Sequence, residues 1–189
     1  MRAVLVDVPE TMLDERRRLG LDVFDEMWEG VLHIVPPPGG PHQRLESCLL
    51  HVFWLAAERS DLLLSAETGL FAAADDYRVP DLAAYRPEHA SDRGIDDRAE
   101  LVVELRSPHD ESYVKLDWYA ARGVTEVLII HPATRTLERY ALRGAAYRLV
   151  EADTEGFVTS EVLGVRLGPV ETPEGSRLRV IDEGNVTDC

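Results

Sequence analysis

The stretch LVVELRSPHDESYVKLDWYAARGVTEVLIIH, residues 101–131, decides the fold. Its apolar run 101–105, interrupted by the single acid Glu104, is typical of a buried strand. Residues 107–122 begin with a serine, a proline and an acid in the spacing that starts helices, and a glycine follows them. The uninterrupted apolar run 127–130 predicts a central strand that is covered on both faces. A strand, a helix and a second strand in this order predict a mixed α/β fold.

Shorter elements on both sides of this unit predict a sheet with helices packed against it. The apolar positions of segment 42–58 recur mostly every three or four residues, which is the spacing of an amphipathic helix. A loop rich in proline and glycine, 36–41, precedes it, and Glu29-Gly30 can form the turn of a short hairpin. The other expected elements are a helix within 3–20, strands at 62–65, 68–73 and 79–85, a loop over 86–98, and a hairpin of 137–142 with 147–150.

Length and charge predict one domain with an acidic, β-rich C-terminal extension. The chain of 189 residues has the size of a single domain, 1–189, with a core over about 20–150. Residues 151–189 hold nine acids and three arginines, and they alternate short apolar pieces with turns. This pattern predicts added edge strands that are followed by a frayed acidic end.

The composition limits the partners and the compartment. The chain has 35 acidic and 20 basic residues, a formal charge of -15 and a pI near 4.7. This charge argues against tight non-specific binding to nucleic acids or anionic membranes, although it allows a local basic groove. Cys48 and Cys189 show no metal-type spacing and predict no disulfide framework. No apolar run is long enough for a membrane span and the first residues do not resemble a signal peptide, so we expect a cytoplasmic protein.

Several common catalytic motifs are missing from the sequence. Neither glycine-rich phosphate loop, G-x-x-x-x-G-K-[ST] or G-x-G-x-x-G, is present, and no G-x-S-x-G marks a hydrolase nucleophile. The six histidines show no zinc-binding spacing. These absences disfavour nucleotide-binding folds, serine hydrolases and zinc enzymes.

Three residues remain as candidates for chemistry: Asp81, Glu104 and Lys115. Asp81 follows a proline in an otherwise apolar strand, and Glu104 interrupts the buried strand. Lys115, the only lysine beside 19 arginines, lies on the next predicted helix, about two turns from its start. Carboxylates can hold Mg²⁺, and a lysine can orient the attacking water or stabilise negative charge in phosphodiester hydrolysis. Taken singly, each residue also fits an ordinary structural or solvent-exposed position, so only their joint order is specific.

Several segments together form a pattern that matches a known family. They are the Glu29-Gly30 hairpin, the proline loop with His42 after it, Val79-Pro80-Asp81, the block from Glu104 to Val124, and Ile130-His131-Pro132. In these segments, which span about residues 20–170, the chain resembles the Uma-two restriction-endonuclease family of the PD-(D/E)XK nuclease superfamily. The resemblance implies a restriction-endonuclease-like mixed β-sheet flanked by helices. It also implies Mg²⁺-dependent hydrolysis of phosphodiester bonds, with Mn²⁺ as a substitute ion.

The resemblance also assigns roles to residues. It implies that Asp81 and Glu104 bind the metal together with the backbone carbonyl of Leu105, and that Lys115 is the catalytic lysine, supplied from the helix. The superfamily pattern places a lysine two residues after the second acid, where this chain has Arg106. Arginine stays protonated, so Arg106 could clamp a phosphate but could hardly act as a base.

Three further residues are accessory candidates. Glu29 or Glu46 could supply another metal carboxylate, although a turn acid and a solvated helix acid describe them better. His42 could lie near the site, although capping of its helix fits it better.

Two functions from different classes fit these observations. A Mg²⁺-dependent endodeoxyribonuclease is favoured by the intact set of two acids and a lysine. A nuclease-fold protein that no longer cleaves, and acts as a binding or regulatory subunit, is favoured by the charge of -15. A basic groove of Arg78, Arg106 and Arg122 would favour cleavage, whereas a hydrolase of small phosphodiesters would not need one. DNA is the expected partner, and a homodimer would allow both strands to be cut.

Overall fold

The buried strand pair β10 (Leu101–Leu105) and β11 (Glu126–Ile130) lies at the centre of a six-stranded sheet. In this computed structural model, which describes residues 3–106 and 111–189, the two strands run parallel and all their residues are buried. The burial on both faces predicted for 127–130 is confirmed. Antiparallel neighbours extend the sheet in the order β13-β12-β11-β10-β7-β4, with β4 at Leu63–Ala66, β7 at Leu82–Tyr85, β12 at Leu137–Arg143 and β13 at Ala146–Val150.

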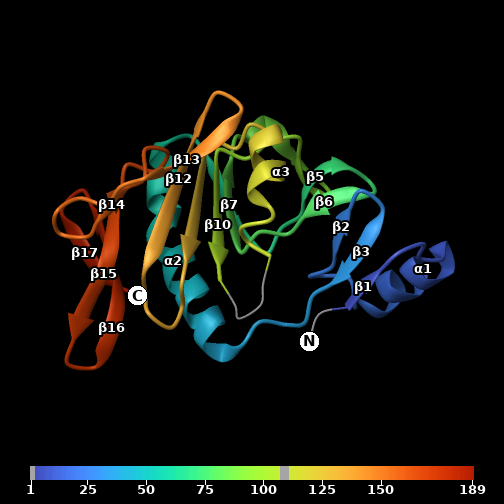
Figure 1. Cartoon of the computed structure of the whole chain (residues 1–189), viewed down its shortest axis with the longest axis horizontal. Helices are drawn as coiled ribbons and strands as arrows, with labels where there is room; N and C mark the ends of the chain where they lie inside the picture. Colours follow the sequence, from blue (N-terminus) through green and yellow to red (C-terminus); the bar gives the residue numbers. More distant parts are fainter. Residues whose placement is uncertain (1–2, 107–110) are drawn as a thin grey trace.

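Helices cover both faces of this sheet (Figure 1). They are α2 (Gly40–Arg59) on one face and α3 (Leu116–Ala121) on the other. Apolar residues of α2 share one hydrophobic cluster with Val103 of β10, and Tyr119 of α3 shares a second cluster with Val102. Because side chains alternate along a strand, Glu104 points to the same face as Val102, toward α3. The predicted mixed α/β layering and the predicted long helix are confirmed.

A second sheet, of seven strands, carries the N-terminal hairpin (Figure 1). The turn between β2 and β3 is formed by Glu29 and Gly30, whose φ angles of 49° and 84° lie in the left-handed region, so the predicted hairpin is confirmed. The strand order is β1-β3-β2-β6-β5-β9-β8. The bounds are β1 Ala3–Leu5, α1 Glu10–Leu19, β2 Glu26–Trp28, β3 Val31–Ile34, β5 Leu70–Ala73, β6 Asp76–Arg78, a 3-10 turn Pro87–His89, β8 Ala90–Ser91 and β9 Gly94–Asp96.

The C-terminal residues form a third sheet that packs beside α2 (Figure 1). Its strands are β14 (Val158–Thr159), β15 (Arg166–Thr172), β16 (Gly175–Asp182) and β17 (Asn185–Asp188). Apolar residues of this sheet join the same hydrophobic cluster as α2. The expected frayed end is wrong, because β17 pairs with β16 and the following Cys189 is buried. None of the helices in the described part of the chain has the length and apolar character needed to cross a bilayer.

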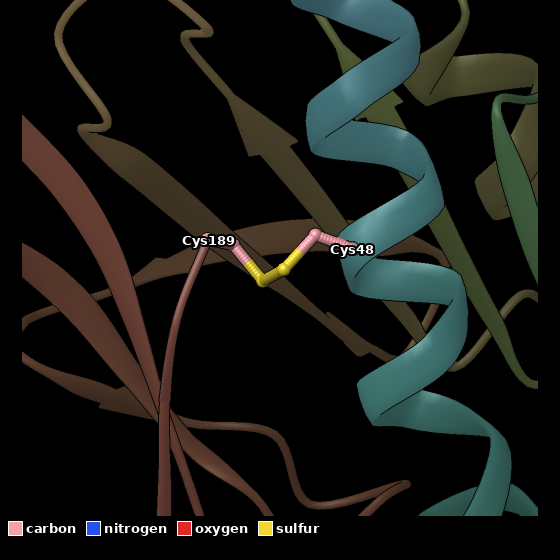
Figure 2. Close-up of a disulfide and its surroundings, with 2 residues drawn as sticks. All are labelled: Cys48 and Cys189. Atoms are coloured by element: carbon pink, nitrogen blue, oxygen red, sulfur yellow. A yellow bond between two sulfur atoms is a disulfide. The ribbon is translucent and has the colours of Figure 1, made fainter.

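A disulfide joins the C-terminal sheet to α2. Cys189 is bonded to Cys48, which lies 141 residues earlier in the sequence (Figure 2). The expectation that the cysteines form no disulfide is wrong, because spacing along the chain does not reveal which residues meet in the fold. Disulfides are rare in the reducing cytosol. The cysteines therefore no longer support the cytoplasmic location, which stays a prediction.

The helix after β10 is shorter than the sequence predicts. Its predicted start, 107–110, lies outside the described residues, and α3 begins only after a series of turns. Lys115 is the N-cap residue of α3, so its predicted position two turns inside a helix is wrong. Gly123, with a φ of 71°, follows the end of the helix as predicted.

Removal of the disulfide should lower the stability of the fold. The Cys48→Ala/Cys189→Ala double variant opens a closed loop of 141 residues, and we expect its free energy of unfolding to fall by about 2–5 kcal/mol. Urea denaturation measures the difference. A reductant should shift the wild-type midpoint to that of the double variant and leave the double variant unchanged. Equal midpoints in all four samples would contradict this role of the disulfide.

Candidate functional site

Glu104 and Lys115 meet in a buried ionic cluster on the α3 side of the central sheet. Nζ of Lys115 lies 3.1 and 3.3 Å from the two carboxylate oxygens of Glu104. It also lies 2.6 Å from Oε1 of Glu26, which comes from β2. The hydroxyl of Tyr119 donates a hydrogen bond of 2.6 Å to Oε1 of Glu104. All four residues are buried, so water screens these interactions little.

Two carboxylates share one ammonium in this cluster, and they do not share it equally. Burial alone would raise the pKa of Glu26, but Lys115 and nearby N–H donors hold it below its ordinary value. Burial raises the pKa of Glu104 to about 7; Lys115 opposes this effect, whereas the negative charges of Asp81 and Glu26 add to it. The two carboxylates raise the pKa of Lys115 although burial opposes them. Lys115 therefore stays protonated, whereas Glu104 takes up a proton near neutral pH.

Asp81 lies beside the end of β10 and makes two hydrogen bonds. The backbone N–H of Leu105 donates a bond of 2.5 Å to Oδ2, and Nε2 of His42 lies 2.8 Å from Oδ1. The first bond fixes the carboxylate of Asp81 next to Leu105, the residue that follows Glu104. The second links the strand end to α2, which carries His42.

His42 and Glu46, one turn apart on α2, form a group with Asp81 that could hold a metal ion. One ligand atom from each residue lies within 4.8 Å of the other two. Burial, together with the negative charges of Glu67 and Asp81, raises the pKa of Glu46 to about 7. Nδ1 of His42 is buried and has no hydrogen-bond partner in the described part of the chain. Two carboxylates and an imidazole at this spacing suit a divalent cation such as Mg²⁺ or Mn²⁺.

Two sequence interpretations of α2 are therefore wrong. Glu46 is not a solvated helix acid, since it is only 3% exposed. His42 does not cap its helix, because its ring bonds to Asp81 and the N-cap residue is Gly39. Sequence pattern assigned both residues by the commonest role of their type, whereas their proximity to Asp81 arises from a segment distant in the chain.

Arg106 faces an open pocket beside this group. The pocket is lined by Gly39, Pro41, His42, Arg106, His131, Pro132, Ala133 and Thr134. The guanidinium of Arg106 also lies 5.0 Å from the ring centre of Tyr113. A guanidinium that lines a pocket can bind the charged part of an anionic ligand.

Glu29 and Arg78 do not take the positions that the sequence suggests for a functional residue. Glu29 is exposed at the hairpin turn and is not in the group around Asp81. Arg78 is 4% exposed and lies between two indole rings, with its Cζ 4.3 and 4.5 Å from the ring centres of Trp28 and Trp118. Arg78 therefore cannot contribute to the basic groove with Arg106 and Arg122 that would have favoured cleavage, because a phosphate cannot reach a buried arginine.

Comparisons with known proteins identify the family to which the chain belongs. The model of the family Uma2, described as "Putative restriction endonuclease", matches residues 19–170. The chain belongs to the Uma2 family. This is the Uma-two family that the sequence resembles, and the matched residues include Asp81, Glu104 and Lys115.

One solved structure shows the same fold as this Uma2 protein. It is the crystal structure of "a putative nuclease belonging to DUF820" from Anabaena variabilis, with a TM-score of 0.59 and 17% sequence identity. The similarity covers 74% of this chain and 83% of that chain, and it confirms the predicted restriction-endonuclease-like mixed sheet. No curated protein matches the chain.

The sequence analysis of this Uma2 protein missed Glu26 and assigned no role to Tyr119. Glu26 lies in a short strand, where an acid flanked by Phe24, Met27 and Trp28 could have signalled a buried charge. Tyr119 lies four residues after Lys115, on the same side of the helix start, so their spacing was consistent with a shared partner. The partner itself, Glu104, could be found only from the fold.

Two variants should shift the pKa of Glu104 in opposite directions. Tyr119→Phe removes a hydrogen bond to the ionised carboxylate and should raise that pKa by about one pH unit, whereas Glu26→Gln removes a neighbouring negative charge and should lower it. Carbon-detected NMR titration of the glutamate carboxyl groups measures the pKa, with Glu104→Gln used to assign the signal. Shifts of the same sign in both variants would contradict the unequal sharing of Lys115.

Proposed function

We propose that this Uma2 protein is a metal-dependent endonuclease that hydrolyses phosphodiester bonds in DNA. The observation that carries the proposal is the contact of the only lysine, Lys115, with both carboxylate oxygens of the strand acid Glu104. Asp81 supports it, because its carboxylate is hydrogen bonded to the backbone of the next residue, Leu105. Two acids and a lysine from three separate segments thus gather at one end of β10.

The donor set supports Mg²⁺ or Mn²⁺ as the cofactor. In this proposal Asp81 and Glu104 bind the ion with the backbone carbonyl of Leu105, and Glu46 and His42 are further ligands. When bound, the ion supplies Lewis acidity that activates water and neutralises charge on the scissile phosphate. Glu104 and Glu46, each with a pKa of about 7, have to lose their protons to become ligands. Metal binding should therefore strengthen as the pH rises through 7.

Lys115 acts as a fixed positive charge and not as a base. Burial opposes the charged form, but Glu104 and Glu26 outweigh it and raise the pKa of Lys115, so the side chain keeps its proton at neutral pH. A buried ammonium next to the metal carboxylates can stabilise the negative charge that develops on the phosphate. Glu26 is a positioning residue in this scheme, because its 2.6 Å contact orients Nζ of Lys115.

Arg106 takes the position of the lysine in the superfamily pattern, and we assign it the binding of phosphate. It lies at the pocket beside His42 and can present a planar pair of N–H donors to phosphate oxygens. Two residues thus share the role that one lysine has in the superfamily pattern: Arg106 contacts the substrate and Lys115 provides the buried charge.

A second candidate function is a non-cleaving nuclease-fold subunit that binds DNA or regulates a partner. The observation that favours it is the pairing of Lys115 with two carboxylates, since its ammonium is already neutralised before any phosphate arrives. The net charge of -15 points the same way. Cleavage itself distinguishes the two functions.

Plasmid nicking should require the metal and the strand acid. We expect nicking of supercoiled DNA with Mg²⁺ or Mn²⁺, none in EDTA, and a loss of at least about 100-fold in Glu104→Gln. Lys115→Arg keeps the charge but moves the donor atoms, so a loss of similar size is expected. Agarose gel electrophoresis of time courses measures the rates.

The matched control for this assay is Glu29→Gln, which removes an exposed acid outside the site. Its nicking rate should equal that of the wild type. If the wild type binds the metal but does not nick DNA, the non-cleaving function becomes better supported than the endonuclease. Equal nicking by wild type and Glu104→Gln would trace the activity to a contaminating nuclease.

A further inference from the structure

Three arginines from separate elements gather beside the pocket: Arg44, Arg135 and Arg177. Arg44 lies on α2, and its guanidinium folds back toward the helix start, so a Cβ built on Gly40 would lie 3.3 Å from Nη1. Arg135 directly follows the pocket residue Thr134 in the turn between β11 and β12. Arg177 lies on β16. Figure 1 shows this turn low in the view, between the N-terminal half of α2 and the C-terminal sheet.

Arg44 and Arg177 repel Arg135, and the part of the chain that the structure describes offers these three no ion pair. Burial and the positive charges of Arg177 and Arg44 lower the pKa of Arg135. Most other arginines contact a carboxylate, but none of these three forms an ion pair within the described residues 3–106 and 111–189. Asp188 lies near enough to feel the charge of Arg177, but its two oxygens accept hydrogen bonds from Arg179.

Arg135 is held in this position by its own turn. Its backbone N–H donates a bond of 2.8 Å to the carbonyl of His131, and the N–H of His131 donates one of 2.8 Å to Thr136. Its φ of 60° is a conformation that residues other than glycine seldom adopt. Nη1 of Arg135 is buried without a hydrogen-bond partner in the described part of the chain. Because Nη1 is buried, only the rest of this half-buried side chain can contact an external anion.

A protein with a charge of -15 that gathers three unpaired arginines in one place creates a local positive field. Guanidinium groups bind phosphate oxygens through pairs of N–H donors, so the ligand chemistry that fits is a row of phosphates. The cluster continues from the pocket that holds Arg106. A chain of phosphates can therefore pass from the site across the β11–β12 turn to the C-terminal sheet.

We propose that Arg44, Arg135 and Arg177 bind the phosphate backbone of double-stranded DNA on one side of the cleavage site. The inference rests on the proposed function and deepens it by naming the surface that anchors the substrate. It gives the C-terminal sheet a role in substrate binding, because Arg177 belongs to β16. It also explains how an acidic protein can hold DNA: the positive charge is concentrated where the backbone passes.

The test is DNA binding without cleavage. A fluorescein-labelled 20-base-pair duplex is titrated in EDTA, by anisotropy, at NaCl concentrations from 50 to 200 mM. The variant Arg44→Ala/Arg135→Ala/Arg177→Ala should raise Kd at least about 10-fold, and the slope of log K against log salt should fall by about 2 to 3, at roughly 0.9 for each lost phosphate contact. Arg44→Glu alone, at an exposed helix position, should weaken binding in the same direction without disturbing the fold.

The matched control removes the same charge elsewhere. Arg17→Ala/Arg18→Ala/Arg148→Ala changes three exposed arginines outside the cluster and should leave Kd within about twofold of the wild type. Equal effects of both triple variants, or none, would overturn the proposal, and so would a wild type that binds only RNA or does not bind the duplex. If the variant of the three arginines loses binding while the wild type never nicks DNA, the proposed DNA-binding role of the arginines is supported and the proposed cleavage is not.

Discussion

The ammonium of Lys115, held between Glu26 and Glu104, is the interaction on which the rest of the site depends. All three groups are buried, so removal of Lys115 leaves two carboxylates without a counter-charge in a poorly solvating environment, a change that costs about 3–5 kcal/mol in other proteins. The contact requires β2, β10 and the start of α3 to be in place together. A chain that folds correctly therefore assembles the acid and the lysine as one unit.

One ammonium does not neutralise the acids that surround it. Glu26 takes the shorter contact, and the pKa of Glu104 rises to about 7. Asp81 and Glu46 add negative charge a short distance away, and the pKa of Glu46 is raised as well. The cluster is therefore short of positive charge as it stands, which is the electrostatic condition for cation binding. Arg106 and the cluster of three arginines lie outside this acidic centre, so in the proposed function the acids would hold the cation and the arginines would bind the phosphates.

Local patterns predicted the central unit of the fold well. The strands β10 and β11, the long helix α2 and the two hairpins each follow from the periodicity and turn residues of one segment. The extent of α3 was predicted less well, because the helix-start signature lies outside the described residues and Lys115 precedes the helix. Lys115 nevertheless reaches Glu104. Tyr119 of α3 binds the carboxylate of Glu104, and Glu26 of β2 binds the ammonium of Lys115.

Contacts between distant segments were not predictable. Glu26 meets Lys115, and Cys48 meets Cys189, only because the sheets bring them together. The basic groove that would have favoured cleavage included Arg78, but its guanidinium is buried between Trp28 and Trp118, and cation–π contacts of this kind leave no sequence signal. The positive surface lies instead on three arginines that no motif connects.

The most direct test of the central claim is a calorimetric Mn²⁺ titration at pH 8 of the wild type, Glu104→Gln, Asp81→Asn and Glu151→Gln. The account predicts one site in the wild type and in Glu151→Gln, which changes an exposed acid, and loss of that site in the other two variants. A site that survives in Glu104→Gln but is lost in Asp81→Asn would confine the metal to Asp81, Glu46 and His42 and would contradict the account. Four identical curves would contradict it entirely.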